Sequence, residues 1–177
     1  SSLIEPLDVA FAEEKDASES QRQHSIGMGD GIGQRNGGAP VNKEMNKLLE
    51  TTDVDYIIAI DTDSLYVRMK PLVDKFDPNS PVDFLNKICS EHFEDILAAA
   101  YDELFRKMNA YENRMEMSRE VIADRAVWIA KKRYFMQVHD NEGVRYAEPK
   151  LKVMGVEAVK SSTPQVCRDK FKKIFNI

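Results

Sequence analysis

The sequence predicts an α+β fold in which an antiparallel sheet is backed by helices. Residues 57–67 hold an apolar run, two carboxylates one residue apart and a second, alternating run, the pattern of a β-hairpin with Asp61 and Asp63 at its tip. Apolar side chains then recur at helical spacing from residue 85 to residue 108, which predicts a long helix lying across the sheet. Strand patterns return from residue 126.

Length and composition fit one soluble domain. The chain has 177 residues, of which 42% are hydrophobic and 31% charged, and no apolar run approaches membrane-spanning length. The first residues do not resemble a signal peptide, and the two cysteines lie far apart without His or Cys at metal spacing. We therefore expect a cytoplasmic protein without a disulfide framework or a membrane partner. Because Ser1 stands where an initiator Met would, we expect a fragment or a processed product.

Residues 1–40 are expected to form a flexible arm of unknown role. Six of the eight glycines lie here, and glycine raises the entropic cost of ordering a backbone. The glycine run at 27–33 does not match a phosphate-binding loop, because no strand precedes it and no Lys-Ser or Lys-Thr follows it. The domain proper is expected to span residues 41–177.

Capping signals place the helices. Residues 41–52 are a helix candidate with apolar residues on one face. The long helix is expected to begin after Ser80, a good N-cap, with Pro81 in the first turn and Asp83 at the positive end of the helix dipole. A last, basic helix is expected to begin at Pro164.

The second half of the chain is expected to form strands and carries the positive charge. Strands are expected at 127–130, 134–138 and 144–147, with a turn signal at 140–143. The overall charge is −5, yet residues 125–177 hold twelve Lys or Arg against five Asp or Glu. A basic end joined to an acidic middle suggests that one part holds a polyanion and the other a metal. The charges are also what ordinary solvated faces carry, so charge alone leaves both interpretations open.

The two carboxylates at the hairpin tip are candidate metal ligands. Residues i and i+2 of a strand point to the same face, so Asp61 and Asp63 would repel each other unless a cation lay between them. A hard divalent cation such as Mg²⁺ takes oxygen ligands and is often shared with substrate phosphates. Asp-Thr-Asp-Ser is also good turn chemistry, so the tetrapeptide alone leaves a plain turn equally open.

Three segments together resemble the family B DNA polymerases. Asp-Thr-Asp-Ser at 61–64, between hydrophobic strands, resembles the DTDS motif of their palm, and Lys-Arg-Tyr at 132–134 resembles their K-x-Y element. The segments at 145–155 and 160–164 resemble the end of the palm in T-even-type phage polymerases, with matching order and spacing. The likeness covers roughly residues 41–177.

The resemblance implies a palm that adds deoxynucleotides to a primer 3′-hydroxyl, directed by a template. By this resemblance Asp63 and Asp61 are the catalytic residues: Asp63 is a direct ligand of two Mg²⁺ ions, for which Mn²⁺ substitutes, and Asp61 lies beside them. Thr62 and Ser64 are expected near the nucleotide and the primer terminus.

The resemblance also assigns the DNA contacts. Lys132 is expected to reach the primer near its end in the minor groove, and Tyr134 to position the primer backbone. Lys131 and Arg133 are expected to contact phosphates, which fix position without reading sequence. The implied partners are primer–template DNA, deoxynucleoside triphosphates and the exonuclease, fingers and thumb segments, in the same chain or a separate one.

Two features depart from the family pattern. Ala59-Ile60 stands where the family usually has Tyr-Gly, which removes backbone freedom before the tip but no metal ligand. The family's other essential Asp lies on an earlier palm strand that residues 1–40 do not supply. We therefore expect the isolated chain to be incomplete and inactive.

Two other functions stay open at this point. A nucleotide-sugar glycosyltransferase also uses Asp-x-Asp with a divalent cation, and a doubly wound nucleotide fold before the motif would favour it. A non-catalytic split-gene subunit that binds DNA or a partner would show the same sequence features.

Overall fold

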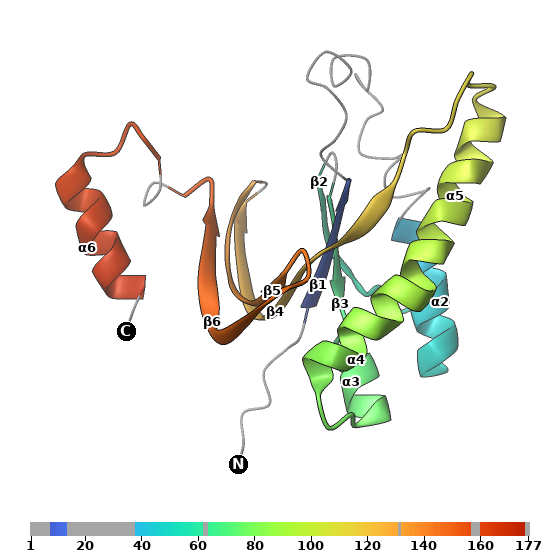
Figure 1. Cartoon of the computed structure of the whole chain (residues 1–177), viewed down its shortest axis with the longest axis horizontal. Helices are drawn as coiled ribbons and strands as arrows, with labels where there is room; N and C mark the ends of the chain where they lie inside the picture. The colour runs from blue at the N-terminus through green and yellow to red at the C-terminus, as the bar shows by residue number, and fades with distance from the viewer. Residues whose placement is uncertain (1–7, 14–37, 62–63, 131, 157–159, 176–177) are drawn as a thin grey trace.

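Six antiparallel strands form one sheet, with helices over part of it (Figure 1). The computed structural model describes residues 8–13, 38–61, 64–130, 132–156 and 160–175, with the backbone alone for 8–13, 61, 172 and 174–175. The strands are β1 (Asp8–Glu13), β2 (Ile57–Asp61), β3 (Ser64–Arg68), β4 (Met117–Ala130), β5 (Arg133–Asn141) and β6 (Val144–Met154). Their order is β2-β3-β1-β4-β5-β6, and each neighbouring pair is antiparallel. The α+β prediction is confirmed.

Strand β1 lies within residues 1–40, the segment for which an arm was expected. It lies in the middle of the sheet, between β3 and β4, with Ala12 opposite both Ser64 and Ser118. Gly38 is also buried, and a Cβ atom built on it would lie 3.2 Å from the Ile60 side chain. Residues 14–37 lie outside the described part of the chain, so the prediction of an arm stays untested there.

Strand β4 is long and bent. Its first half pairs with β1 and its second half with β5, and the register shifts at several points along it. Such bulges bend a strand and increase its local twist. The expected strand at 127–130 therefore begins ten residues earlier than predicted, because the bulges interrupt the period-two pattern on which the prediction depended.

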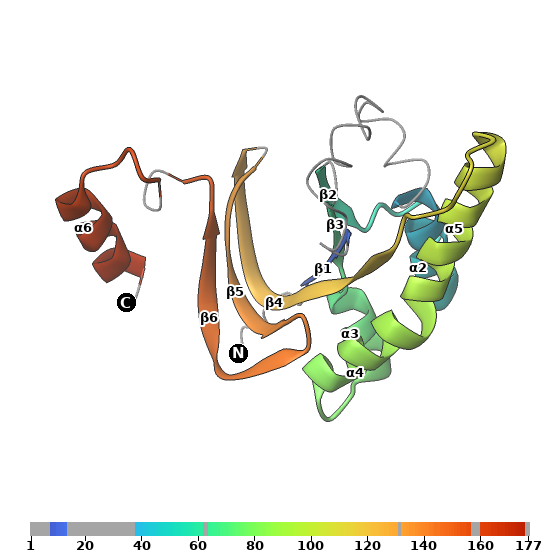
Figure 2. The ribbon, with the colours of Figure 1, turned by 45° about the horizontal axis from the view of Figure 1, so that its top comes forward.

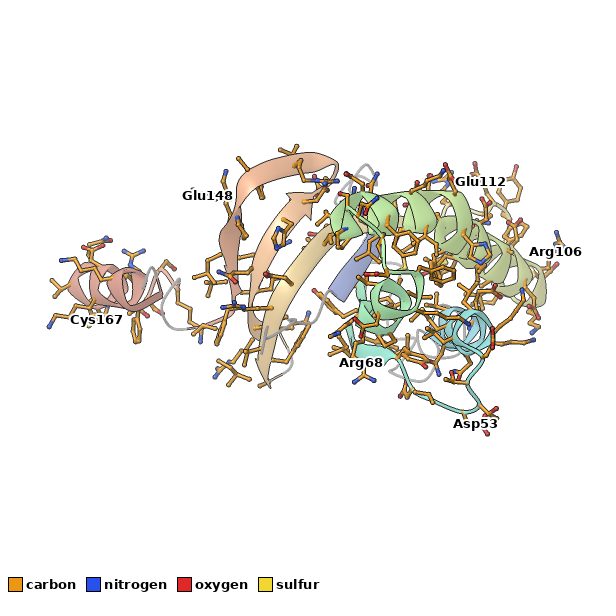
Figure 3. All side chains as sticks on the ribbon, turned by 90° about the horizontal axis from the view of Figure 1, so that it is seen from below. Asp53, Arg68, Arg106, Glu112, Glu148 and Cys167 are labelled. Carbon is orange, nitrogen blue, oxygen red and sulfur yellow. The ribbon has the colours of Figure 1, made fainter. Side chains whose placement is uncertain are left out.

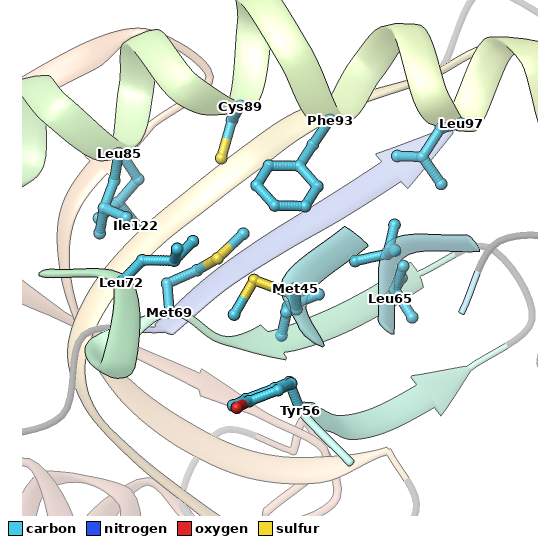
Figure 4. Packing of buried hydrophobic residues seen from close by; sticks show 12 residues of the cluster. Met45, Tyr56, Leu65, Met69, Leu72, Leu85, Cys89, Phe93, Leu97 and Ile122 are labelled. Atoms are coloured by element: carbon cyan, nitrogen blue, oxygen red, sulfur yellow. The ribbon is translucent and has the colours of Figure 1, made fainter. Parts of the chain in front are cut away.

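A helical layer covers one face of the sheet. It consists of α2 (Ala39–Leu49), α3 (Lys70–Phe76), α4 (Pro81–Ile88) and α5 (Glu94–Lys107), and a π-helical turn, Cys89–Phe93, joins α4 to α5. The predicted helices over 41–52 and after Ser80 are confirmed, with small shifts at their ends, whereas α3 was not predicted. Fully buried side chains fill the space between helices and sheet, among them Met45, Leu72, Phe93 and Ile122 (Figure 4).

The π-helical turn keeps one apolar stripe aimed at the sheet. Leu85, Cys89, Phe93 and Leu97 are each fully buried and lie four residues apart. An α-helix has 3.6 residues per turn, so a strict four-residue stripe would drift around the helix and leave the sheet. One wider turn compensates this drift. The four-residue spacing of these apolar side chains, longer than the 3.6 residues of one α-helical turn, is the sequence signal for this wider turn.

A buried ionic network ties the helical layer to the far hairpin of the sheet. Asp140 on β5 is 2% exposed and accepts hydrogen bonds from Arg119 on β4 and from Arg145 on β6, the latter at 3.2 Å. Arg119 also donates to Asn86 on α4 at 2.5 Å, and Arg145 lies 2.8 Å from Asp83 at the start of that helix. Sheet and helix are therefore joined through paired charges as well as apolar packing.

Helix α6 (Gln165–Phe175) stands apart from the rest, with Cys167 on it exposed (Figure 3). It begins at Gln165, one residue after the predicted start at Pro164. Among the described helices, none has the length and apolarity needed to cross a membrane.

Replacing Asp140 by Asn is expected to lower the free energy of unfolding at pH 7 by about 3 kcal/mol, because it leaves the buried Arg119 charge without its partner. Burial acts to raise the pKa of Asp140, but hydrogen bonds from Arg119 and Arg145 outweigh it and hold the pKa below its ordinary value of 3.8. The pair therefore stabilises the fold above that pH and ceases to do so as the pH falls through the lowered pKa.

Denaturant titrations over a pH series measure both effects. Asp74→Asn is the matched control, since Asp74 pairs with Lys70 at an exposed position and should cost less than about 1 kcal/mol. Equal losses for the two variants would contradict a special role for the buried network.

Candidate functional site

The β2–β3 hairpin carries the predicted carboxylates at its tip. Val, Ile, Leu and Tyr favour the two strands, and the register places Asp61 opposite Ser64, so Thr62 and Asp63 form a two-residue connection. Thr62, Asp63 and the side chain of Asp61 lie outside the described part of the chain. The expectation that both carboxylates share one face and hold a cation therefore stays a prediction.

The β4–β5 hairpin carries the predicted cationic tip. Lys132 has a left-handed backbone, with a φ of 60°, and its side chain and that of Arg133 are exposed. Tyr134 is partly buried and points back toward the sheet. Lys131 lies outside the described residues.

Gly155 packs closely against the backbone of this cationic tip. Its φ is 62°, and a Cβ atom built on it would lie 1.9 Å from the carbonyl oxygen of Lys132. Only a residue without a side chain permits this approach of the two backbones. Gly155 belongs to the motif segment 145–155, and the contact gives that segment a physical role.

The bend in β4 brings the two tips to the same side of the molecule. Figures 1 and 2 show the end of β2 and the start of β3, and likewise the end of β4 and the start of β5, at the upper ends of these strands. Between them lies an aromatic floor of three side chains, Tyr66 on β3, Trp128 on β4 and Tyr134 on β5. Ring centroids are 5.5 Å apart for Tyr66 and Trp128 and 5.6 Å apart for Tyr66 and Tyr134, at steep interplanar angles. Such edge-to-face contacts are favourable and directional.

Hydrogen bonds join the floor to the carboxylate hairpin. The Tyr66 hydroxyl donates to the Tyr134 hydroxyl at 3.0 Å, and Ser64 is hydrogen-bonded to Tyr66 as well. Burial and the bond to Tyr134 together raise the pKa of Tyr66 well above its ordinary value, although Ser64 acts in the other direction. Tyr66 therefore remains a neutral donor at any working pH.

Charged groups of both signs border the floor. Lys152 Nζ lies 2.6 Å from Glu120 Oε1, and Lys150 Nζ lies 4.1 Å from the centre of the Tyr146 ring. Lys152 is the cross-strand partner of Met136, which packs against Tyr66, so Lys152 shares that face. Within the described residues, no group of three or more Asp, Glu, His or Cys side chains is placed to hold a metal ion.

The structure thus brings Ser64, Lys132, Arg133 and Tyr134 to one side, and it leaves Thr62, Asp63 and Lys131 undescribed. The sequence analysis did not single out three residues that contribute to the site. It placed Tyr66 and Trp128 only on strands and Gly155 only in a motif segment. The signal for Tyr66 was available, since in an alternating strand it faces away from the buried neighbours Leu65 and Val67.

Comparison with known proteins identifies relatives of one segment. No model of a known protein family matches the chain. The chain is 38% identical over 147 residues to the DNA-directed DNA polymerase of Escherichia phage RB69, which covers 75% of this chain and 16% of that protein. It is 38% identical over 143 residues to the DNA-directed DNA polymerase of Enterobacteria phage T4, which covers 73% of this chain and 16% of that protein. The chain therefore spans about a sixth of the length of these relatives.

Replacing Gly155 by Ala is expected to displace the cationic tip, because the added methyl group cannot fit beside the Lys132 carbonyl. Trp128 is the chain's single tryptophan, and its ring centroid lies 6.1 Å from that of Tyr134, so its fluorescence emission should report the displacement. Gly143→Ala is the control. Gly143 also has a positive φ, of 83°, but nothing lies within 4 Å of its added Cβ.

Both variants should lose about 1–2 kcal/mol of unfolding free energy from the left-handed backbone. Gly155→Ala alone should lose more and shift the emission. Identical spectra and stabilities for the two variants would rule out the close backbone contact.

Proposed function

We propose that this chain, which is a segment of the T-even-type family B DNA polymerases, forms part of their palm and takes part in adding deoxynucleotides to a primer during DNA replication. The 38% identity to two phage DNA-directed DNA polymerases carries the proposal. An alignment that covers 75% of the chain must include the middle of the chain, whichever residues the alignment begins and ends at. It therefore includes the 61–64 tip and the whole of β4. The described sheet supports it, since ring contacts among Tyr66, Trp128 and Tyr134 connect β3, which follows the carboxylates in the chain, with the strands that carry the cationic tip.

Asp61 and Asp63 are proposed to hold Mg²⁺, for which Mn²⁺ would substitute. Carboxylate oxygens are the ligands that this hard cation prefers, and the pairing of Asp61 with Ser64 leaves only two residues of sequence between the strands. When bound, two such ions activate the primer 3′-hydroxyl and neutralise charge on the leaving pyrophosphate. The protein's own part is to fix the hairpin, through the buried side chains of β3 and the hydrogen bond between Ser64 and Tyr66.

The β4–β5 tip is proposed to hold the primer strand. Exposed Lys132 and Arg133 are suited to DNA, with Lys132 at the primer end and Arg133, together with Lys131, on phosphates. Tyr134 would orient the primer backbone, while Thr62 and Ser64 would lie near the incoming nucleotide. Contacts of this kind accept every sequence, which a polymerase requires.

Activity is proposed to need further polymerase parts. About five-sixths of the length of the relatives lies outside the aligned segment, and phosphoryl transfer depends on positioning by several elements at once. The corresponding exonuclease, fingers and thumb segments would lie in the same chain or in a partner chain. Because both relatives are phage proteins, we place the assembly in the cytoplasm of an infected cell.

The alternatives differ in what supports them. A doubly wound nucleotide fold before the motif would favour the glycosyltransferase interpretation, whereas the described strand pairs are all antiparallel. A subunit that binds DNA without catalysis fits the same fold, and mixing the chain with the remaining polymerase segments in a primer-extension assay distinguishes it from a palm.

Calorimetric titration with Mn²⁺ is expected to show weak binding that Asp63→Ala abolishes, because the substitution removes one of the two clustered carboxylates. Glu148→Ala, which removes an exposed carboxylate on β6, should leave the titration unchanged. Binding that survives Asp63→Ala would remove the metal assignment from this hairpin.

DNA binding should weaken with salt and show no sequence preference, and it tests the proposal most directly. If Lys131 and Arg133 each neutralise a phosphate, replacing either by Ala should lower the slope of log affinity against log salt by about one unit. Lys47→Ala removes an exposed positive charge on α2, outside the β4–β5 tip, and should not change the slope. An unchanged slope after both tip residues are replaced would argue against phosphate contacts there.

A further inference from the structure

The hydroxyl of Tyr66 connects two strands that are not neighbours. In the sheet order, β1 and β4 lie between β3 and β5. Neighbouring strands lie about 4.8 Å apart, so three steps across a flat sheet would separate β3 from β5 by about 14 Å. The two hydroxyls are nevertheless 3.0 Å apart, because both side chains lean across the bent face.

The bond is one link of a chain of hydroxyl groups. Ser64, directly after the Asp63 position, is hydrogen-bonded to Tyr66, and Tyr66 donates to Tyr134. Tyr66 is only 7% exposed, and Trp128 packs against both tyrosine rings, so the chain has little freedom to rearrange. Hydrogen bonds in such a series polarise one another and strengthen.

This arrangement sets the direction of the Tyr134 hydroxyl. Tyr134 accepts from Tyr66 through its oxygen, which leaves its own hydrogen to be donated elsewhere. Tyr134 is only partly buried, so its side chain is not sealed off from an acceptor outside the protein. A phosphate oxygen of the primer is such an acceptor.

We propose that Tyr66 is a positioning residue that couples the carboxylate hairpin to the primer-holding tip by fixing the orientation of the Tyr134 hydroxyl. The proposal rests on the proposed function, since it takes the primer strand as the group that Tyr134 contacts. It adds a residue that contacts neither metal nor DNA and acts only through Tyr134 and Ser64. A shift of either tip would then be transmitted to the other.

A double-mutant cycle on the full chain tests the coupling. Affinity for a fluorescein-labelled primer–template is measured by anisotropy for the parent, Tyr66→Phe, Tyr134→Phe and the double variant. Tyr66→Phe keeps the ring and removes the hydrogen bond to Tyr134 together with the one to Ser64; loss of the bond to Tyr134 should lower the affinity about five-fold. In the Tyr134→Phe background the same change should have almost no further effect, because the bond is already absent.

Two controls separate positioning from general damage. Tyr56→Phe removes a hydroxyl from a tyrosine that is 4% exposed and bonded to Thr51 in the other core, and it should leave the affinity unchanged. The salt slope should be the same in every variant, since no charge is altered, whereas a collapsed tip would lower it. If Tyr66→Phe does not fold, Ser64→Ala replaces it in the cycle and should show the same dependence on Tyr134.

The outcomes are distinct. Binding by the parent with additive losses, or with no loss for Tyr66→Phe, overturns the coupling and leaves the proposed function standing. If the parent does not bind primed DNA, that result overturns the proposed function and the coupling together. A loss that disappears in the Tyr134→Phe background, at constant salt slope, supports both.

Discussion

Strand β4 is shared by the two halves of the sheet, and the position of both tips depends on that sharing. Its first residues pair with β1 and its last with β5, and the two pairings overlap only around residues 121–123. At this overlap three consecutive side chains are buried, Val121 and Ala123 on the aromatic face and Ile122 on the helical face. The bend at this point is therefore packed from both sides. A slip of one residue would exchange the two faces, bury the wrong side chains and separate the tips.

The two faces of the sheet have different tasks. The helical face holds the larger core, and its paired charges around Asp140 anchor α4 to β4 and β5. The other face holds a smaller cluster built around Tyr66, Val121 and Met136, with aromatic rings at its border. Stability can thus come mainly from the side away from the tips. The aromatic face then needs to supply only local rigidity.

Much of this could be predicted from the sequence, and the failures have physical causes. The hairpin at 57–67 and the helix after Ser80 follow from local periodicity, which the structure preserves. The first half of β4 could not be found in this way, because bulges break its alternation, and β1 pairs only with strands far along the chain, so no neighbouring hairpin partner marks it. The bond between Tyr66 and Tyr134 joins residues 68 positions apart. The K-x-Y motif identifies Tyr134 by its residue type and its distance from Lys132 in the sequence. It does not reveal that Tyr66 is the residue that orients Tyr134.

The candidate site combines two kinds of interaction that suit different tasks. Exposed Lys and Arg side chains attract a polyanion over a distance, yet they are flexible and screened by salt, so they define its position poorly. The groups beneath them are rigid: Gly155 fixes the backbone of Lys132, and Tyr66 and Trp128 fix Tyr134. A reaction that needs alignment within a fraction of an ångström must take its geometry from the second kind. In the proposed site the hydroxyl of the buried Tyr66, which carries no charge, would act through geometry of this second kind, by orienting Tyr134.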